Sequence, residues 1–124
     1  MRARTKGNEN IGLYYNLPVF KDTYQLTLKL FELTRDFPRE YKFTLGQDMK
    51  RNCISLVRSI YRANKCKDKQ AYLENFLDDF EVFKLEVRLC ADLHIMSLRR
   101  QAELAVHMDS IGKQITGWRN ASRV

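Results

Sequence analysis

Residues that break helices and strands are scarce in this chain, which has only 5 glycines and 2 prolines among its 124 residues. A β-sandwich or β-barrel of this length needs a turn signal about every ten residues. The shortage therefore argues against an all-β fold and predicts a few long helices.

Long hydrophobic runs are absent as well. No stretch reaches the roughly 18 consecutive apolar residues of a membrane-spanning helix, and the N-terminal sequence MRARTKGNENIG is basic without the apolar segment of a secretion signal. The three cysteines, Cys53, Cys66 and Cys90, are an odd number at spacings that match no disulfide framework and no zinc motif. These absences predict a cytoplasmic protein in a reducing compartment, with no membrane partner.

Positive charge, by contrast, is in excess. The chain has 22 lysines and arginines against 15 aspartates and glutamates, a formal net charge of +7. Such an excess favours a polyanionic partner where the basic residues are clustered, and only increases solubility where they are scattered. Their positions along the predicted helices therefore matter more than their sum.

Hydrophobic periodicity divides the chain into one helical domain and two tails. We expect a flexible basic N-terminal tail over residues 1–16, a four-helix bundle over 17–119 and a short C-terminal tail over 120–124. Helices are predicted at about 19–36, 44–64, 68–93 and 98–118. Joined by short connections, they predict an all-α, antiparallel four-helix bundle. The runner-up fold is an extended assembly whose helices pair between chains.

Two of these helices have recognisable N-terminal signals. Thr44 is placed to cap the second helix, with Gln47 completing a capping box, and Ser97 is placed to cap the fourth. The fourth helix also has a side of mostly small residues, which predicts that a neighbouring helix approaches it closely. That side consists of Leu98, Ala102, Ala105, Asp109 and Gly112.

Each predicted helix has one apolar row at helical spacing, which predicts the core. The rows are Val19, Leu26, Leu30, Leu33 and Phe37; Leu45, Met49, Cys53, Leu56, Val57 and Ile60; Leu73, Phe76, Phe80, Phe83, Val87 and Cys90; and Leu104, Met108, Ile111 and Ile115. The first and third helices each carry a second apolar face. These second faces are Phe20, Tyr24, Thr27, Leu28 and Phe31, and Val82, Leu85, Leu89 and Leu93. A bundle core covers only one face, so the other must meet more of the same chain or another subunit, and we expect a homo-oligomer.

The second predicted helix carries a line of basic residues. Arg58, Arg62 and Lys65 fall within about 40° of Arg51 on a helical wheel, opposite the apolar row. No acidic residue lies between Arg51 and Lys67, and Lys69 extends the patch. Because arginine binds phosphate oxygens in a bidentate way, we predict a face that contacts a nucleic-acid backbone.

Two other interpretations of this line remain open. It can be an ordinary solvated helix face, or it can form ion pairs within the chain or between subunits. The candidate partners are the acidic residues of the third helix, Glu74, Asp78, Asp79, Glu81 and Glu86.

Residues suited to catalysis or metal binding do not form a recognisable set. His94 and His107 are thirteen positions apart, and Cys53 and Cys90 fall in apolar rows, where a thiol has a raised pKa. There is no glycine-rich phosphate loop. The sequence therefore predicts a protein that is not an enzyme and has no metal and no cofactor. Trp118, near two arginines, suits base stacking but more commonly such a residue packs against neighbouring helices.

The segment from Leu17 to Asn64 resembles the accessory variability determinant proteins of diversity-generating retroelements. The resemblance also extends to the four-helix-bundle family that includes proteins encoded by intervening sequences in 23S ribosomal RNA genes. The matching features are the helix containing Tyr24, the Phe37-Pro38 stop followed by a basic residue, Phe43-Thr44-Leu45-Gly46, Ile111-Gly112-Lys113-Gln114 and Gly117-Trp118.

This resemblance implies a barrel-shaped homopentamer of four-helix protomers that binds a reverse transcriptase and its template RNA. Such proteins are not catalysts but support mutagenic retrohoming, and DNA is a further candidate ligand. The nucleic-acid-binding region implied for this chain comprises Lys50, Arg51, Arg58, Arg62 and Lys65. The alternative function is a structural oligomeric scaffold, of the intervening-sequence type, that binds an acidic protein partner.

Overall fold

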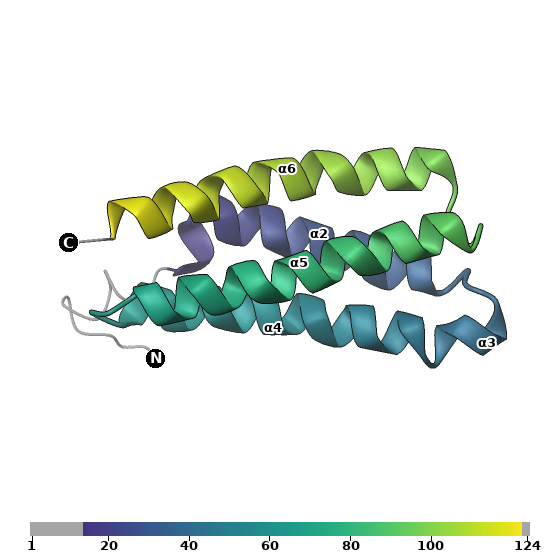
Figure 1. Cartoon of the computed structure of the whole chain (residues 1–124), viewed down its shortest axis with the longest axis horizontal. Coiled ribbons are helices and arrows are strands. Elements are labelled where there is room, and N and C mark those ends of the chain that lie inside the picture. Colours follow the sequence, from purple (N-terminus) through teal and green to yellow (C-terminus); the bar gives the residue numbers. More distant parts are fainter. Residues whose placement is uncertain (1–13, 123–124) are drawn as a thin grey trace.

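The computed structural model describes residues 14–122, and all regular secondary structure in that range is helical (Figure 1). Four long helices are present: α2 (Pro18–Thr34), α4 (Leu45–Lys65), α5 (Gln70–Asp92) and α6 (Leu98–Ala121). Two short elements, the 3-10 helix η1 (Tyr14–Asn16) and the one-turn helix α3 (Arg39–Lys42), complete the described part of the chain. The all-α prediction is confirmed. Of the predicted tails, 1–16 and 120–124, residues 1–13 and 123–124 lie outside the described residues, whereas Tyr14–Asn16 form η1 and α6 continues to Ala121.

The long helices run alternately up and down, so the start of α2 and the end of α6 lie at the same end of the bundle (Figure 1). Contacts between them follow a square in the order α2, α4, α5, α6 and back to α2. Helices α2 and α5 therefore occupy diagonal corners. This arrangement is the predicted antiparallel four-helix bundle, not the extended assembly.

The predicted apolar rows form the core of the bundle. Phe76, Phe80 and Phe83 of α5 are among the largest fully buried side chains. Almost every other member of the four rows is buried, and only Leu45, Val57 and Met108 are half-buried. The 3.6-residue period thus identified the buried side of each helix correctly.

The beginning of α4 differs from the prediction. Thr44 does not accept a capping hydrogen bond; its Oγ1 instead donates to the carbonyl oxygen of Glu40, 2.9 Å away. The reason is α3, which was not predicted and places that carbonyl one turn before Thr44. At the start of α4, a Cβ on Gly46 would lie 3.3 Å from the carbonyl oxygen of Tyr41, so glycine permits this close approach.

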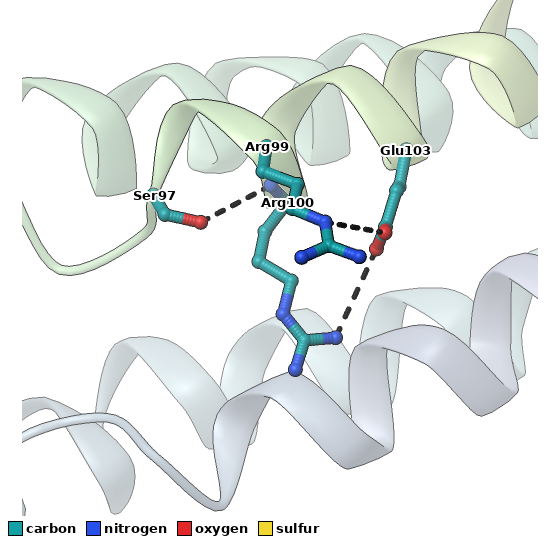
Figure 2. A network of polar contacts seen from close by, with 4 residues as sticks. All are labelled: Ser97, Arg99, Arg100 and Glu103. Carbon is teal, nitrogen blue, oxygen red and sulfur yellow. Dashed lines mark hydrogen bonds and ion pairs between the residues drawn. The ribbon is translucent and has the colours of Figure 1, made fainter.

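The N-cap predicted for the fourth helix is confirmed. The Ser97 hydroxyl accepts a hydrogen bond from the backbone N–H of Arg100 at 3.2 Å, as Figure 2 shows. In the same turn, the Glu103 carboxylate pairs with both Arg99 and Arg100 at 3.8 Å. Two cations at a helix N-terminus are unfavourable, and Glu103 offsets part of that cost.

The second apolar faces remain largely uncovered. Tyr24, Leu28 and Phe31 of α2 are exposed, whereas Phe20 is half-buried beneath Tyr14 of η1. The whole second face of α5 is exposed, with Leu85 at 65%. The chain itself thus covers only Phe20 and the buried Thr27 of the α2 face.

The prediction for the small-residue side of α6 is wrong within residues 14–122. Ala102, Ala105 and Asp109 are exposed and Leu98 is 82% exposed, so no described helix packs closely over them. Near Gly112 the closest neighbour is Phe80, which a Cβ would meet at 3.5 Å. The apolar row of α6 points into the core, which turns this side outward.

None of the helices described between Tyr14 and Ser122 combines the length and the apolarity that crossing a bilayer requires.

Candidate nucleic-acid interface

The candidate interface is the outer side of α4. Arg51, Arg58, Arg62 and Lys65, which we call the basic stripe, are all exposed. They face outward because Met49, Cys53, Leu56 and Ile60, on the opposite side of the helix, are fully buried. The apolar row therefore determines the direction in which the stripe points.

Lys50, the fifth predicted site residue, does not lie on this line. It is half-buried on the side of α4 that faces α2, with its Nζ 5.4 Å from the centroid of the Phe31 ring. A cation over an aromatic face is attracted by the ring quadrupole. Lys50 and two stripe residues, Arg51 and Arg58, line the same shallow hollow. Its lining residues are Phe31, Gln47, Lys50, Arg51, Asn52, Ile54, Ser55 and Arg58.

Charge neutralisation of the stripe within residues 14–122 is slight. Arg51 pairs with Asp48 at 3.5 Å, but both side chains are highly exposed, at 74% and 63%. Exposed pairs of this kind contribute at most about 1 kcal/mol. Arg58 and Arg62 form no ion pair with any described residue. Their guanidinium groups are therefore available to an anionic partner.

Four of the five acidic residues of α5 that are candidate partners are engaged elsewhere among the described side chains, and Asp78 is the exception. Asp79 accepts a hydrogen bond from Ser55 at 3.1 Å, and Glu86 accepts one from Asn52 at 2.7 Å. The ion pairs of α5 join Glu74 to Arg119 at 3.6 Å, Glu81 to Lys84 at 2.9 Å and Asp92 to Arg88 at 3.8 Å. Pairing between the stripe and α5 inside one chain, one of the alternatives left open by the sequence, is thus not found among the described residues.

Lys69 does not extend the basic patch as the sequence suggested. Its ammonium group donates to the carbonyl oxygens of Ala63 at 2.8 Å, Asn64 at 3.4 Å and Cys66 at 2.7 Å. These carbonyls end α4, where backbone acceptors lack helical partners and the helix dipole is negative. Lys69 is therefore a cap for α4, because the loop before α5 turns its side chain back over that helix end.

Replacing Lys69 by methionine should lower stability by about 1–2 kcal/mol, because charge-assisted bonds to the last turn of α4 are lost. RNA affinity should stay nearly unchanged. Chemical denaturation and RNA titration measure the two quantities. Lys67→Met, at an exposed position in the same loop, is the matched control and should leave stability intact. Equal losses in both variants would contradict the capping role.

Glu86 is a buried carboxyl group in the contact between α4 and α5. Burial raises its pKa above the ordinary 4.5, while the hydrogen bond from Asn52 lowers the pKa and the nearby charge of Asp48 raises it further. Because the folded protein binds this proton more readily than the unfolded chain, Glu86 adds most to stability below pH 4.5. That contribution declines as the pH rises through the raised pKa.

Changing Glu86 to glutamine should therefore raise the melting temperature more at pH 8 than at pH 4. The amide oxygen can still accept from Asn52, and the buried charge is removed. Thermal unfolding monitored by circular dichroism at the two pH values measures this effect. Glu81→Gln, which alters an exposed carboxylate paired with Lys84, should show no such pH-dependent gain. The same gain at both pH values would refute the assignment.

The thiols and histidines form no reactive or metal-binding cluster in the described part of the chain. Burial raises the pKa of Cys53 to about 12 and that of Cys90 to about 11, so both are protonated at neutral pH. No group of three or more His, Cys, Asp or Glu side chains among residues 14–122 is arranged to hold a metal ion. Trp118 packs against the core, the commoner of its two predicted roles.

One feature of this surface could not be found by sequence reasoning. Tyr14 and Tyr15 were assigned to the tail, but η1 brings Tyr14 against both Phe20 of α2 and Tyr61 of α4. The only sequence signal was the pair of adjacent tyrosines before Pro18. Their contacts depend on the turn that η1 makes.

Comparison with known proteins agrees with this geometry. The family model described as bAvd-like matches residues 19–122, which cover all four long helices except the first residue of α2. No curated protein matches the chain. The chain therefore belongs to the bAvd-like family, the accessory variability determinant family that its sequence resembles.

Proposed function

We propose that this protein is a non-catalytic, cytoplasmic accessory factor that binds template RNA, and also DNA, and associates with a reverse transcriptase in mutagenic retrohoming. Membership of the bAvd-like family supports the accessory role. The observation that carries RNA binding is the exposure of Arg58 and Arg62 without a carboxylate partner among the described residues.

The chemistry of the stripe suits a phosphate backbone. Arg58 and Arg62 are one helical turn apart, and Arg51 and Lys65 continue the line in both directions. Each arginine presents a planar fork of donors that matches two phosphate oxygens. Such contacts position a nucleic acid without reading its bases, so binding has little sequence preference.

Self-association is the second part of the proposal. The proposed contact surfaces, Leu28 and Phe31 on α2 and the uncovered face of α5, lie on diagonal corners of the bundle and differ in sequence. When a face of one copy meets a different face of the next, the contacts run head to tail and close into a ring if the rotation permits. A homopentameric barrel is the closed ring that the family resemblance implies.

Two measurements test the proposal. Fluorescence anisotropy with labelled RNA and DNA over a range of salt concentrations should give affinity that falls steeply with salt, for both nucleic acids. Co-purification with the reverse transcriptase of the same element should recover a complex. Tight binding to an acidic protein that neither RNA nor DNA displaces would instead favour the oligomeric scaffold.

A further inference from the structure

Helix α2 begins and α4 ends at the same end of the bundle (Figure 1), and five aromatic side chains from these segments and η1 contact one another there. We call them the aromatic end cluster: Tyr14, Tyr15, Phe20, Tyr24 and Tyr61. The half-buried Tyr14 is central. Its ring meets Tyr15 at 5.5 Å, Phe20 at 5.2 Å and Tyr61 at 5.1 Å between centroids, each close to edge-on. Phe20 in turn stacks on Tyr24 at 5.9 Å.

The outer members of this cluster are unusually open to solvent. Tyr15 is 51% exposed, Tyr24 is 47% exposed and Tyr61 is 39% exposed. Tyr14 packs η1 onto the bundle against Phe20 and one side of Tyr61, which leaves the rest of the outer rings open. The outer rings therefore present aromatic surface that the chain does not use for its own core.

The cluster adjoins the basic stripe. Tyr61 lies on α4 between Arg58 and Lys65, three residues after the first and four residues before the second. The Lys65 Nζ is 4.7 Å from the Tyr61 ring centroid and 3.1 Å from its hydroxyl oxygen. A nucleic-acid backbone bound along the basic stripe would therefore place its bases next to the exposed rings.

We infer that the aromatic end cluster stacks unpaired nucleobases, so that the protein prefers single-stranded to double-stranded nucleic acid. Proteins that bind single strands combine a cationic track for phosphates with aromatic rings for bases. Here α4 supplies the track, and α2, η1 and α4 together supply the rings. In a duplex the bases are stacked on one another and only the phosphates reach the stripe. The inference rests on the proposed nucleic-acid binding and adds the form of the ligand.

The test compares one mixed-sequence RNA oligonucleotide, alone and annealed to its complement. The variant Tyr24→Leu/Tyr61→Leu removes two exposed rings but keeps apolar side chains of useful size. Single-strand affinity should fall roughly fivefold or more for each ring that stacks a base. Duplex affinity and the salt dependence of binding should hardly change, because no charge is altered. Tyr24→Phe/Tyr61→Phe keeps both rings and should restore single-strand affinity.

A direct optical signal accompanies the affinities. An RNA that contains 2-aminopurine loses fluorescence when that base stacks on a ring, so quenching should occur with the unaltered protein and weaken in the leucine variant. Equal effects of the leucine variant on single strands and duplexes, or no effect on either, would overturn the inference. So would a change in oligomer size, because Tyr24 would then be a subunit contact. If the unaltered protein binds neither form, the proposed function itself fails.

Discussion

Replacing Arg51, Arg58 and Arg62 together by glutamate should weaken RNA binding more than about 100-fold, because each arginine can make charge-assisted hydrogen bonds to phosphate. The log-log dependence of affinity on salt should also become shallower by roughly two to three units, about 0.7–0.9 for each lost contact. Folding should survive. The three side chains are exposed, and such substitutions usually alter stability by less than about 0.5 kcal/mol each.

A matched control separates the stripe from the overall charge of the protein. The variant Arg88→Glu/Arg99→Glu/Lys113→Glu changes the net charge by the same amount at highly exposed positions on α5 and α6. It should retain most of the affinity. Equal weakening by both variants would mean that only the general positive field attracts RNA. A stripe variant that is folded and binds normally would show that these arginines form a merely solvated face.

The second large effect concerns the uncovered face of α5. Changing Leu85 and Leu89 to glutamine should convert the oligomer to monomers at micromolar concentration, as measured by light scattering coupled to size-exclusion chromatography. Burying each leucine contributes about 1.5–3 kcal/mol, so each subunit contact should weaken about 100-fold or more. The protomer should stay folded, because Leu85 is 65% exposed and Leu89 is 44% exposed before any assembly.

Exposed apolar residues on α6 provide the control for this experiment. Leu98 is 82% exposed and Val106 is 70% exposed, and neither belongs to the proposed contact faces. Leu98→Gln/Val106→Gln should leave the oligomer size unchanged. An unaltered protein that is strictly monomeric at the same concentration would exclude the ring. Dissociation of the α6 variant alone would mean that the subunit contact lies on α6, and it would contradict the proposed contact on α5.

Local sequence was sufficient for the four long helices and the core. The apolar rows recur at helical spacing, so they identified the four long helices, with ends displaced by only a few residues, and the buried side of each. Ser97 could be recognised as an N-cap because that bond closes within one turn. The helical spacing also predicts that Arg58 and Arg62 point outward, because the apolar row lies on the opposite side of α4.

Features that depend on other segments could not be predicted in this way. Thr44 resembles a capping residue, but whether its hydroxyl caps α4 or bonds backward depends on α3. Lys69 resembles part of a basic patch, but the path of its loop places the ammonium on three carbonyl oxygens. In both cases the local pattern allowed two partners, and only the position of a neighbouring segment selected one of them.

The sequence by itself determined that this protein is an all-α bundle with a basic helix face and spare apolar faces, because periodicity and charge are local properties of the chain. Only the tertiary structure decided which of those groups remain available. It showed that Arg58 and Arg62 have no partner on α5, that Lys50 lies over Phe31 and that the rings of η1, α2 and α4 meet at one end. Such facts concern distances between segments far apart in the sequence, and these distances exist only after the helices have packed.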